Sequence, residues 1–543
     1  MKKYIAPFLL VFLLAGCGGG SSNSGTSTHS GGPGSAPFST AASGHCAAPR
    51  AANILDQNNQ PFGDVQGSLP DEMAWIASFV NTTYLWYPDV PAVSAAPYTI
   101  GATVPYVDPA NNATSTETLT SNHDVVDAYF NAQRSPLLTA SGKPKDQFHF
   151  TYLTSYWQQL TSAGNVSGFG FQAAQIPNAT QIQIEVAYTS PGTPAALHGL
   201  VRGTRFIRIN NVDVATASSQ ADLNILDEAL YSPVANTSYT FVVQIPGQPS
   251  QSTIILQPVS ITLTPVTIVG TLPAPNASVG YILYTDQIAT AESELIAAVT
   301  QLQQANNSAG ITDLVLDLRY NGGGYLDIAS ELAYMIAGPV ITSGKFFEQD
   351  TYNSKNPFGL TLSQDTVPFH STTQGFSTAD TLTPLPSLNL STVYVITSAG
   401  TCSASEAIMN GLIGAGVKVV QVGSTTCGKP YGFYPQDNCS TTYFAIQFEG
   451  VNYLGFGAYA DGFVPGGTGS TANNLPGCAA NDDLAHQLGD PAEASLATAL
   501  YYRNNGGACP SPALGLGSAK RGNPALLRSQ ARENRILRRG LNR

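Results

Sequence analysis

The sequence predicts an α/β domain over residues 259–510, preceded by a β-rich domain over 165–258 and a small helical domain over 47–160. From Val279 onward, apolar β runs alternate with helical stretches, which is typical of strands joined by crossover helices. Between 165 and 258, short β runs are separated by turns. Before residue 160, apolar side chains recur at spacings of three and four, as on the buried face of a helix.

The composition describes an acidic chain with few charges. Charged residues make up 11% of the 543 residues, and the formal net charge is −12. This acidity argues against nucleic acid as the main partner. Residues 511–543 differ from the rest, since they hold eight Lys or Arg and one Glu. We expect a disordered basic tail there; contact with a surface or with anionic lipid is the alternative.

The N-terminus carries an export signal. Lys2 and Lys3 precede an apolar run from Tyr4 to Leu14, which is followed by Leu-Ala-Gly-Cys ending at Cys17. This pattern resembles a bacterial lipobox, which implies a signal peptide over 1–16 and lipidation of Cys17. Residues 17–46 are then a lipid-bearing, Gly/Ser-rich tether. A plain secretory signal that happens to contain Cys17 is the alternative.

These features predict a location in the bacterial cell envelope, where the protein is lipid-anchored and faces the periplasm. The outer membrane is favoured over the inner one, because Gly18 is no obvious inner-membrane retention signal. No other run reaches the roughly 18 apolar residues that a membrane-spanning helix needs.

Six cysteines remain after Cys17, and an even number in an exported chain indicates disulfides. Six cysteines allow 15 connectivities. Cys427 and Cys439 bracket a predicted loop and are the pair we favour. The chain has neither a CxxC nor an HExxH motif, so we expect no metal site and no cofactor.

The N-terminal domain contains two predicted helices, Leu69–Tyr87 and His123–Ala132, and no residue to which we assign chemistry. The β-rich domain that follows opens on Gly168-Phe169-Gly170-Phe171. Its remaining predicted elements are the strands Gln181–Tyr188, Arg205–Ile209 and Thr237–Ile245, and the helix Asp222–Leu230.

This β-rich block resembles a PDZ domain. The resemblance implies that Gly168–Phe171 is the carboxylate-binding loop, in which successive backbone N–H groups point at the carboxyl end of a peptide. The peptide would add to the sheet as an extra edge strand. A small β domain without any ligand is the alternative.

Three segments of the α/β domain follow predicted strand ends: Leu316–Gly324, Ser398–Gly411 and Val422–Pro430. The predicted strands are Val279–Tyr284, Asp313–Leu318, Thr392–Thr397 and Val417–Val422, and the predicted helices are Glu292–Gln304, Tyr325–Ile336 and Ser405–Ile413. Catalytic groups in open α/β folds gather at the carboxyl ends of strands, so these three segments form a candidate site.

Ser403 lies just before a predicted helix, with Glu406 three residues later. This spacing is that of a capping box, in which both residues only cap the helix. A nucleophile at this position would instead gain from the free N–H groups and the positive end of the helix dipole.

A serine nucleophile needs a base, and none of the seven histidines lies in the three segments. Lys429 does, in a glycine-containing turn after the last strand. A lysine acts as a base only when neutral, which requires a desolvated site. A solvated surface lysine is the alternative reading of the same pattern.

Together the segments resemble the carboxyl-terminal-processing, or tail-specific, serine peptidases. That family carries Ser-Ala-Ser-Glu, as at Ser403–Glu406, and about 25 residues later a Thr-Phe-Gly-Lys-Gly stretch, which Thr425–Lys429 resembles. The segment Leu316–Gly324 resembles the family's Gly-rich loop. The resemblance implies a crotonase/ClpP-like α/β domain, polypeptide substrates and a Ser-Lys dyad.

Carried over residue by residue, Ser403 is the nucleophile and Lys429 the general base. The backbone N–H groups of Ala404, Gly323 and Gly324 are candidate oxyanion-hole donors, and Glu406 and Thr426 are supporting residues. Ser405 is an alternative nucleophile.

The sequence also departs from the family pattern. Pro430 follows the lysine where the family has Gly, and Phe433 replaces a Gln often found there. Gly414 or Ala415 stands where an Asp is common, and Cys402 and Cys427 flank the two catalytic positions. These changes motivate a second hypothesis, a catalytically impaired, lipid-anchored protein that binds peptides or acts as a scaffold through its PDZ-like domain.

Overall fold

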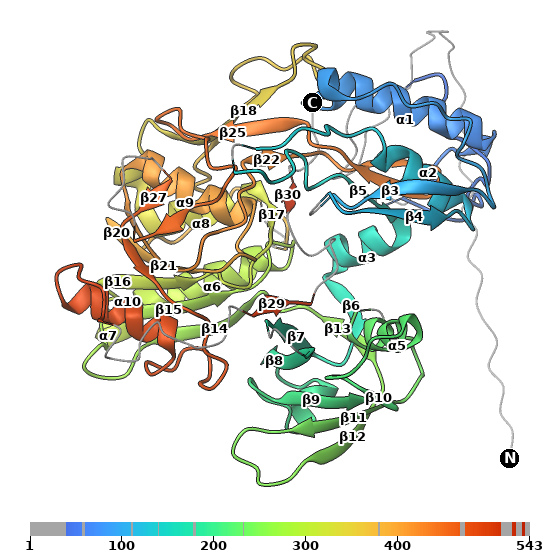
Figure 1. Cartoon of the computed structure of the whole chain (residues 1–543). Coiled ribbons are helices and arrows are strands. Elements are labelled where there is room, and N and C mark those ends of the chain that lie inside the picture. Colours follow the sequence, from blue (N-terminus) through green and yellow to red (C-terminus); the bar gives the residue numbers. More distant parts are fainter. Residues whose placement is uncertain are drawn as a thin grey trace, which may run out of the picture.

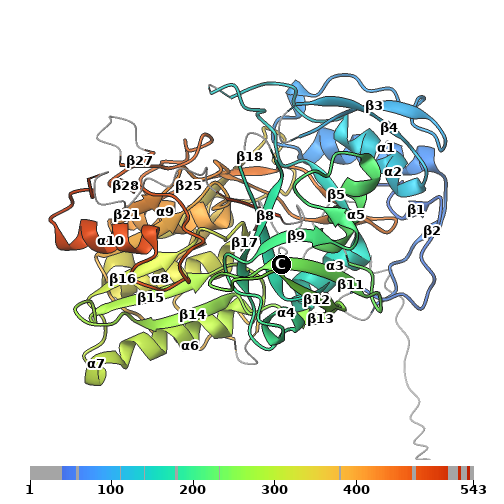
Figure 2. The same cartoon turned by 60° about the horizontal axis from the view of Figure 1, so that its bottom comes forward.

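The computed structural model describes residues 40–511, with gaps at 57–59, 110–111, 140, 178–180, 232, 378–380 and 467–472, and the tail segments 524–527 and 535–537. The predicted signal peptide and Cys17 lie outside the described residues. Among the described helices, none combines the length and the apolar character needed to cross a membrane. Figures 1 and 2 show helix α1 (Leu69–Thr83) and helix α10 (Ala494–Asn504) at opposite ends of the molecule.

A six-stranded sheet forms the centre of the α/β part, and five of its strands are parallel. The first strand is antiparallel to the second. Most residues of the inner strands are buried, which explains why they read as near-continuous apolar runs. The strand order is β14 (Val266–Thr271), β15 (Val279–Tyr284), β16 (Asp313–Asp317), β20 (Thr392–Thr397), β21 (Lys418–Gly423) and β28 (Gly477–Ala479).

Helices cover both faces of this sheet. Alternate residues of β16, such as Leu314 and Leu316, pack with α6 (Ala291–Gln303), α8 (Leu326–Thr342) and α9 (Ala404–Ala415). Val315 and its neighbours on the opposite face pack with α10. The predicted alternation of strands and helices is confirmed. The short helix α7 (Ala305–Ser308) follows α6.

Smaller sheets surround the central one. A four-stranded sheet has the order β19 (Thr366–Pro368), β18 (Phe346–Tyr352), β25 (Phe448–Val451) and β22 (Tyr431–Gly432). Three of the two-stranded sheets are β1 (His45–Cys46) with β2 (Val65–Gln66), β3 (Thr103–Val107) with β4 (Thr114–Thr118), and β26 (Val464–Pro465) with β27 (Asn474–Leu475).

The β-rich part has its own sheet and its own core. The strand order is β12 (Ser252–Leu256), β11 (Tyr239–Gln244), β9 (Arg205–Ile209), β8 (Gln183–Thr189), β7 (Phe171–Ile176) and β29 (Ala525–Leu526), with β10 (Val212–Asp213) beside β9. Helices α4 (Pro194–Leu197) and α5 (Gln220–Tyr231) complete it. The pairing of β6 (Asn165–Gly168) with β13 (Val259–Thr262) joins the chain entering this part to the chain leaving it.

The N-terminal part is less helical and less separate than predicted. Besides α1, α2 (Asn122–Asn131), α3 (Thr154–Ala163) and the 3₁₀ turn Tyr87–Asp89, it contains the hairpin β3–β4 and strand β5 (Phe150–Leu153). Strand β5 extends the sheet of β23 (Gln436–Asn438) and β24 (Thr441–Phe444). Aromatic residues from both parts form one core. Long-range strand pairing of this kind leaves no local sequence signal.

The disulfides are Cys46–Cys439, Cys402–Cys427 and Cys478–Cys509. The favoured pair Cys427–Cys439 is therefore wrong, because each of these cysteines has a partner outside the loop that the two bracket. Cys46–Cys439 links the start of the described chain to the C-terminal half.

Two short segments of the basic tail differ from the expectation of disorder. Within it, strand β29 pairs with β7, and strand β30 (Arg535–Leu537) pairs with β17 (Gly323–Tyr325). Partners more than 200 residues away in the sequence supply this order, so the composition of the tail alone could not reveal it.

Two buried carboxyl groups predict how stability depends on pH. The Gln374 N–H donates to both Glu292 Oε1 (2.8 Å) and Glu331 Oε1 (2.9 Å). Burial, and then the charge of Glu292, raise the pKa of Glu331 from its ordinary value of 4.5 to about 9. Between these two values the folded protein keeps a proton that the unfolded chain releases.

The free energy of unfolding should therefore fall as the pH rises from 4.5 towards 9, with a slope from this group of up to about 1.4 kcal/mol per pH unit. Glu331→Gln should remove this slope, measured by urea unfolding at a series of pH values. An unchanged slope would contradict the assignment.

Candidate active site

Ser403 occupies a strained position between strand β20 and helix α9. It is the N-cap residue of α9, with φ 64° and ψ −122°. Such a conformation costs a non-glycine residue about 1–3 kcal/mol and is found mostly at functional sites. Ser403 is 0% exposed. Its Oγ faces the Glu406 N–H as in a capping box, but in a geometry too poor for a hydrogen bond.

The buried carboxylate of Glu406 joins the two loops that the sequence singled out. Its Oε2 accepts the N–H of Ser403 (2.9 Å) and of Lys429 (2.8 Å), so both backbone nitrogens lie within 2.9 Å of one oxygen atom. Its Oε1 accepts the N–H of Gly428 and the hydroxyl of Thr426. Burial raises the pKa of Glu406, and these hydrogen bonds act in the opposite direction.

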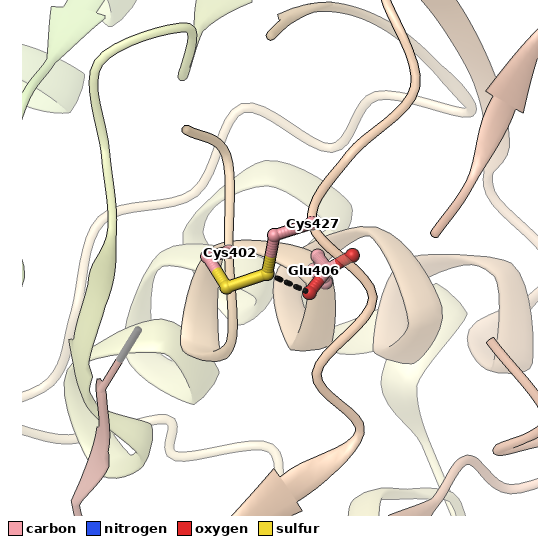
Figure 3. Close-up of side chains that lie close together, drawn as sticks. All are labelled: Cys402, Glu406 and Cys427. Atoms are coloured by element: carbon pink, nitrogen blue, oxygen red, sulfur yellow. Dashed lines mark hydrogen bonds between the residues drawn. A yellow bond between two sulfur atoms is a disulfide. The ribbon is translucent and has the colours of Figure 1, made fainter. Parts of the chain in front are cut away.

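A disulfide joins the same two loops. Cys402 precedes Ser403 and Cys427 precedes the Gly428–Lys429 turn, with Cα atoms 5.2 Å apart. Figure 3 shows this bridge beside Glu406, and the Cys427 Sγ lies 3.4 Å from Glu406 Oε2. Since the two sulfurs bond to each other, they offer no thiolate to a metal ion.

Lys429 is fully buried between aromatic rings. Its Nζ lies 4.4 Å from the centre of the Phe433 ring and 4.6 Å from that of Phe148. Phe433 stands where a Gln is often found in the family that the motifs resemble, so this departure in sequence places a ring against the lysine. Phe148 comes from the N-terminal part, to which we assigned no chemistry. No sequence signal distinguishes it from the other apolar residues of that part.

The Gly-rich loop is held against Ser403 by Asn321. The Asn321 carbonyl accepts the N–H of Cys402 (3.2 Å) and the hydroxyl of Ser405 (3.1 Å). Its side-chain Oδ1 accepts the N–H of Gly323 (3.0 Å), which is therefore already engaged. Of the three candidate oxyanion-hole donors, Ala404 and Gly324 remain, and Gly324 pairs with Ile536 of strand β30.

The hydroxyl of Ser405 has two partners, since it also accepts a hydrogen bond from Gln287 Nε2 (3.1 Å). This use of its hydroxyl disfavours Ser405 as the alternative nucleophile. Gly324 has φ 149°, and a Cβ there would lie 2.0 Å from the Gln287 carbonyl oxygen. Only glycine fits at this point of the loop.

A buried charge network holds the segment that leads into the Gly-rich loop. Arg319 bonds to Asp317 (2.8 Å), Asp482 (2.7 Å) and Glu493 (2.7 Å). Asp482 also pairs with Arg202, which belongs to the β-rich part. Burial would raise the pKa of Asp482, but Arg202 and Arg319 outweigh it and lower that pKa to about 2. The pairing links the position of the β-rich part to the base of the Gly-rich loop.

The predicted carboxylate loop Gly168–Phe171 lies between β6 and β7. Phe169 is buried in the core of the β-rich part, and its carbonyl accepts the N–H of Ala195 (2.9 Å). Gly170 has φ 91°, and a Cβ there would collide with the side chain of Thr193. The loop is thus fixed by packing, and its glycine allows a close approach.

Glu406 provides a test of the site's architecture. Glu406→Gln would place an amide group among three N–H donors and should lower the free energy of unfolding by about 3 kcal/mol. Asp227→Asn also replaces a carboxylate by an amide, but at an exposed position, and should change the free energy of unfolding by no more than about 0.5 kcal/mol. Urea unfolding of both variants makes the comparison, and equal effects would contradict the role of Glu406.

Residues 278–434 match peptidase family S41. A carboxyl-terminal-processing protease of Synechocystis is 31% identical over 178 residues, which cover 32% of this chain and 38% of the relative. A protein of the same description from Picosynechococcus is 26% identical over 274 residues, covering 50% and 56%. The chain thus matches less than two thirds of either relative's length.

Among solved structures, a protein from Bacteroides fragilis assigned to the S41 proteases superimposes with a TM-score of 0.54 at 21% identity. The match covers 79% of this chain and 97% of that one, and at this identity it shows the fold alone. The family predicted from the sequence motifs is confirmed. The segment 278–434, which carries Ser403, Lys429 and the Gly-rich loop, is the part of the chain that matches peptidase family S41.

Proposed function

We propose that the protein is a serine endopeptidase that hydrolyses peptide bonds of exported polypeptides through a Ser403–Lys429 dyad. One observation carries the proposal: Glu406 Oε2 accepts the backbone N–H groups of both residues, which brings the two loops together around one buried carboxylate. The strained, buried position of Ser403 supports it. So does the match of residues 278–434 to a peptidase family.

In the proposed reaction, Ser403 Oγ attacks the carbonyl carbon of the scissile bond while Lys429 Nζ takes the hydroxyl proton. Lys429 then gives this proton to the leaving amine, and an acyl-enzyme remains on Ser403. A water molecule attacks the ester carbonyl and Lys429 accepts its proton; Lys429 then passes this proton to Ser403 Oγ as the ester bond breaks, and the carboxylic acid product leaves. Lys429 Nζ is buried between Phe148 and Phe433, and a general base must be neutral when it takes the proton.

The oxyanion of each tetrahedral intermediate would lie near the N-terminus of α9. The N–H of Ala404 and that of Gly324 are the proposed donors, since the N–H of Gly323 is bonded to Asn321. Removing one such donor typically costs about 10²–10³ in kcat. The parallel sheet, with helices on both faces, supports a crotonase/ClpP-like assignment for this part.

The β-rich part would act as the PDZ-like module that captures the carboxyl-terminal region of a substrate. Its strand β7 follows the Gly168–Phe171 loop and, apart from the tail strand β29, is the last strand of the sheet, so an added strand can pair with it when β29 leaves. The lipid on Cys17 would hold the protein in the cell envelope with this module facing the periplasm.

A second candidate function is peptide binding without catalysis. Ser403 and Lys429 are both 0% exposed, so a substrate reaches them only after the surrounding segments move. Such a protein would bind peptides through the β-rich part and release them uncleaved.

The dyad is tested by digestion of an unstructured polypeptide, with its carboxyl end either free or amidated. Ser403→Ala and Lys429→Ala should each lower kcat by about 10⁴-fold or more. The exposed residues Ser363 and Lys418 supply matched controls as Ser363→Ala and Lys418→Ala, which should leave kcat unchanged. The PDZ-like role predicts faster cleavage of the free-ended substrate.

Cleavage that survives either dyad variant would refute the mechanism. An intact substrate with the unaltered protein, together with measurable peptide affinity, would instead establish the second candidate function.

A further inference from the structure

The C-terminal tail lies on the sheet edge that the proposed function assigns to substrate. Strand β29 pairs antiparallel with β7, with Ala525 opposite Gln175 and Leu526 opposite Ala174. The pairing continues through the Leu527 N–H, which donates to the Ala173 carbonyl (2.9 Å). Gln172 Nε2 also donates to the Leu527 carbonyl (2.7 Å). The view in Figure 1 places β29 next to β7, at the border of the β-rich part.

Two leucine side chains hold this strand. Leu527 packs against the core of the β-rich part, the core that includes Phe169 and Phe206. Leu526 packs against the cluster of Ala174, Ala187 and Tyr320. Ala525 is exposed, so it contributes backbone pairing but no buried side chain.

The direction of β29 is that of a captured peptide. Strand β7 begins at Phe171, the last residue of the Gly168–Phe171 loop, and runs away from it. Because β29 is antiparallel to β7, the tail runs towards the loop as it proceeds from Ala525 to Leu527. A substrate whose carboxyl end entered this loop would have the same orientation.

A second tail segment lies in the candidate active site. Strand β30 pairs parallel with β17, with Arg535 opposite Gly323 and Ile536 opposite Gly324. It also contacts β22 and α9. These three elements contain or directly follow the Gly-rich loop, the Lys429 turn and Ser403. Figure 1 shows β30 beside β17 and β22.

We propose that the C-terminal tail is an intramolecular ligand that competes with polypeptide substrates for the β7 edge and for strand β17. This inference rests on the proposed function, because it takes these two surfaces to be the places where substrate binds. The tail is connected to the catalytic part, so its effective concentration at the two surfaces reaches the millimolar range. A contact too weak to hold a free peptide is then enough to keep the surfaces occupied.

Electrostatic attraction also favours binding of the tail to the rest of the protein. The tail has eight Lys or Arg and one Glu, whereas the whole chain carries a formal net charge of −12. The acidic remainder of the protein therefore attracts its own tail, and salt screens this attraction.

The test uses the full chain with Ser403→Ala, so that binding is measured without any turnover. The probe is a fluorescein-labelled synthetic peptide of residues 520–543, followed by anisotropy. Leu526→Asp combined with Leu527→Asp in the protein should displace the internal tail and lower the Kd of the probe about tenfold. Ala525→Asp adds a charge at the exposed position and should leave the Kd unchanged. Thermal unfolding checks that all three proteins are folded.

A probe peptide carrying Asp at 526 and 527 controls for unspecific attraction of a basic peptide and should bind weakly to every variant. Equal Kd values for the leucine variant and the Ala525→Asp control would overturn the inference, as would no binding of the probe to any variant. Hydrolysis of an unstructured polypeptide by the chain that retains Ser403 separates the two proposals. Turnover that the leucine substitutions do not accelerate refutes the tail's role and leaves the peptidase intact.

Discussion

The site depends on a carboxylate that has been removed from water and surrounded by hydrogen-bond donors. Glu406 is 0% exposed, and an unpartnered carboxylate in that position would be strongly destabilising. Three backbone N–H groups and one hydroxyl offset the loss of hydration. Because these donors come from the segments around Ser403 and Lys429, the folded loops can satisfy the carboxylate only when they lie together. The Cys402–Cys427 disulfide constrains the same pair of loops covalently. The placement of Ser403 and Lys429 thus follows from the need to satisfy the buried carboxylate of Glu406, which also caps α9.

A second set of buried charges holds the segment that leads into the Gly-rich loop. Arg319 lies in the segment that leads into the Gly-rich loop, and its guanidinium is neutralised by Asp317, Asp482 and Glu493. Removing one partner of such a network leaves an uncompensated charge and is far more costly than breaking a surface ion pair. Arg202 reaches Asp482 from the β-rich part. Movement of that part relative to the sheet therefore disturbs a carboxylate that also neutralises Arg319. The β-rich part and the Gly-rich loop depend on one shared carboxylate, so they cannot be positioned independently.

The sequence predicts the three segments that meet at the site, but not the residues and tail strands that reach it from distant parts of the chain. The apolar β runs, and the loops that follow them, predict that the Ser403, Lys429 and Gly-rich segments meet, because parallel strands end at one edge. Phe148 could not be found this way. It reaches Lys429 through the pairing of β5 with β24, which are almost 300 residues apart and carry no local signature. Disulfide connectivity has the same origin in tertiary structure, and proximity in sequence wrongly favoured Cys427–Cys439. The strands of the tail are likewise formed by distant partners, in a segment whose composition indicates disorder.

The shortness of the tail strands is consistent with a ligand that must be displaced. Strands of two and three residues are too short to be stable by themselves, and only Leu526 and Leu527 are known to add side-chain packing. Binding of the tail strands to β7 and β17 then depends on their covalent tether and on charge attraction. A polypeptide that forms a longer strand along β7, and buries more than two side chains, gains more contacts than the tail loses when it leaves. Only a polypeptide that binds more strongly than the tail would therefore displace it, so the tail would not block these surfaces permanently. Since displacement frees β17 and β22 as well as β7, binding at the sheet edge and access to Ser403 become two consequences of one event.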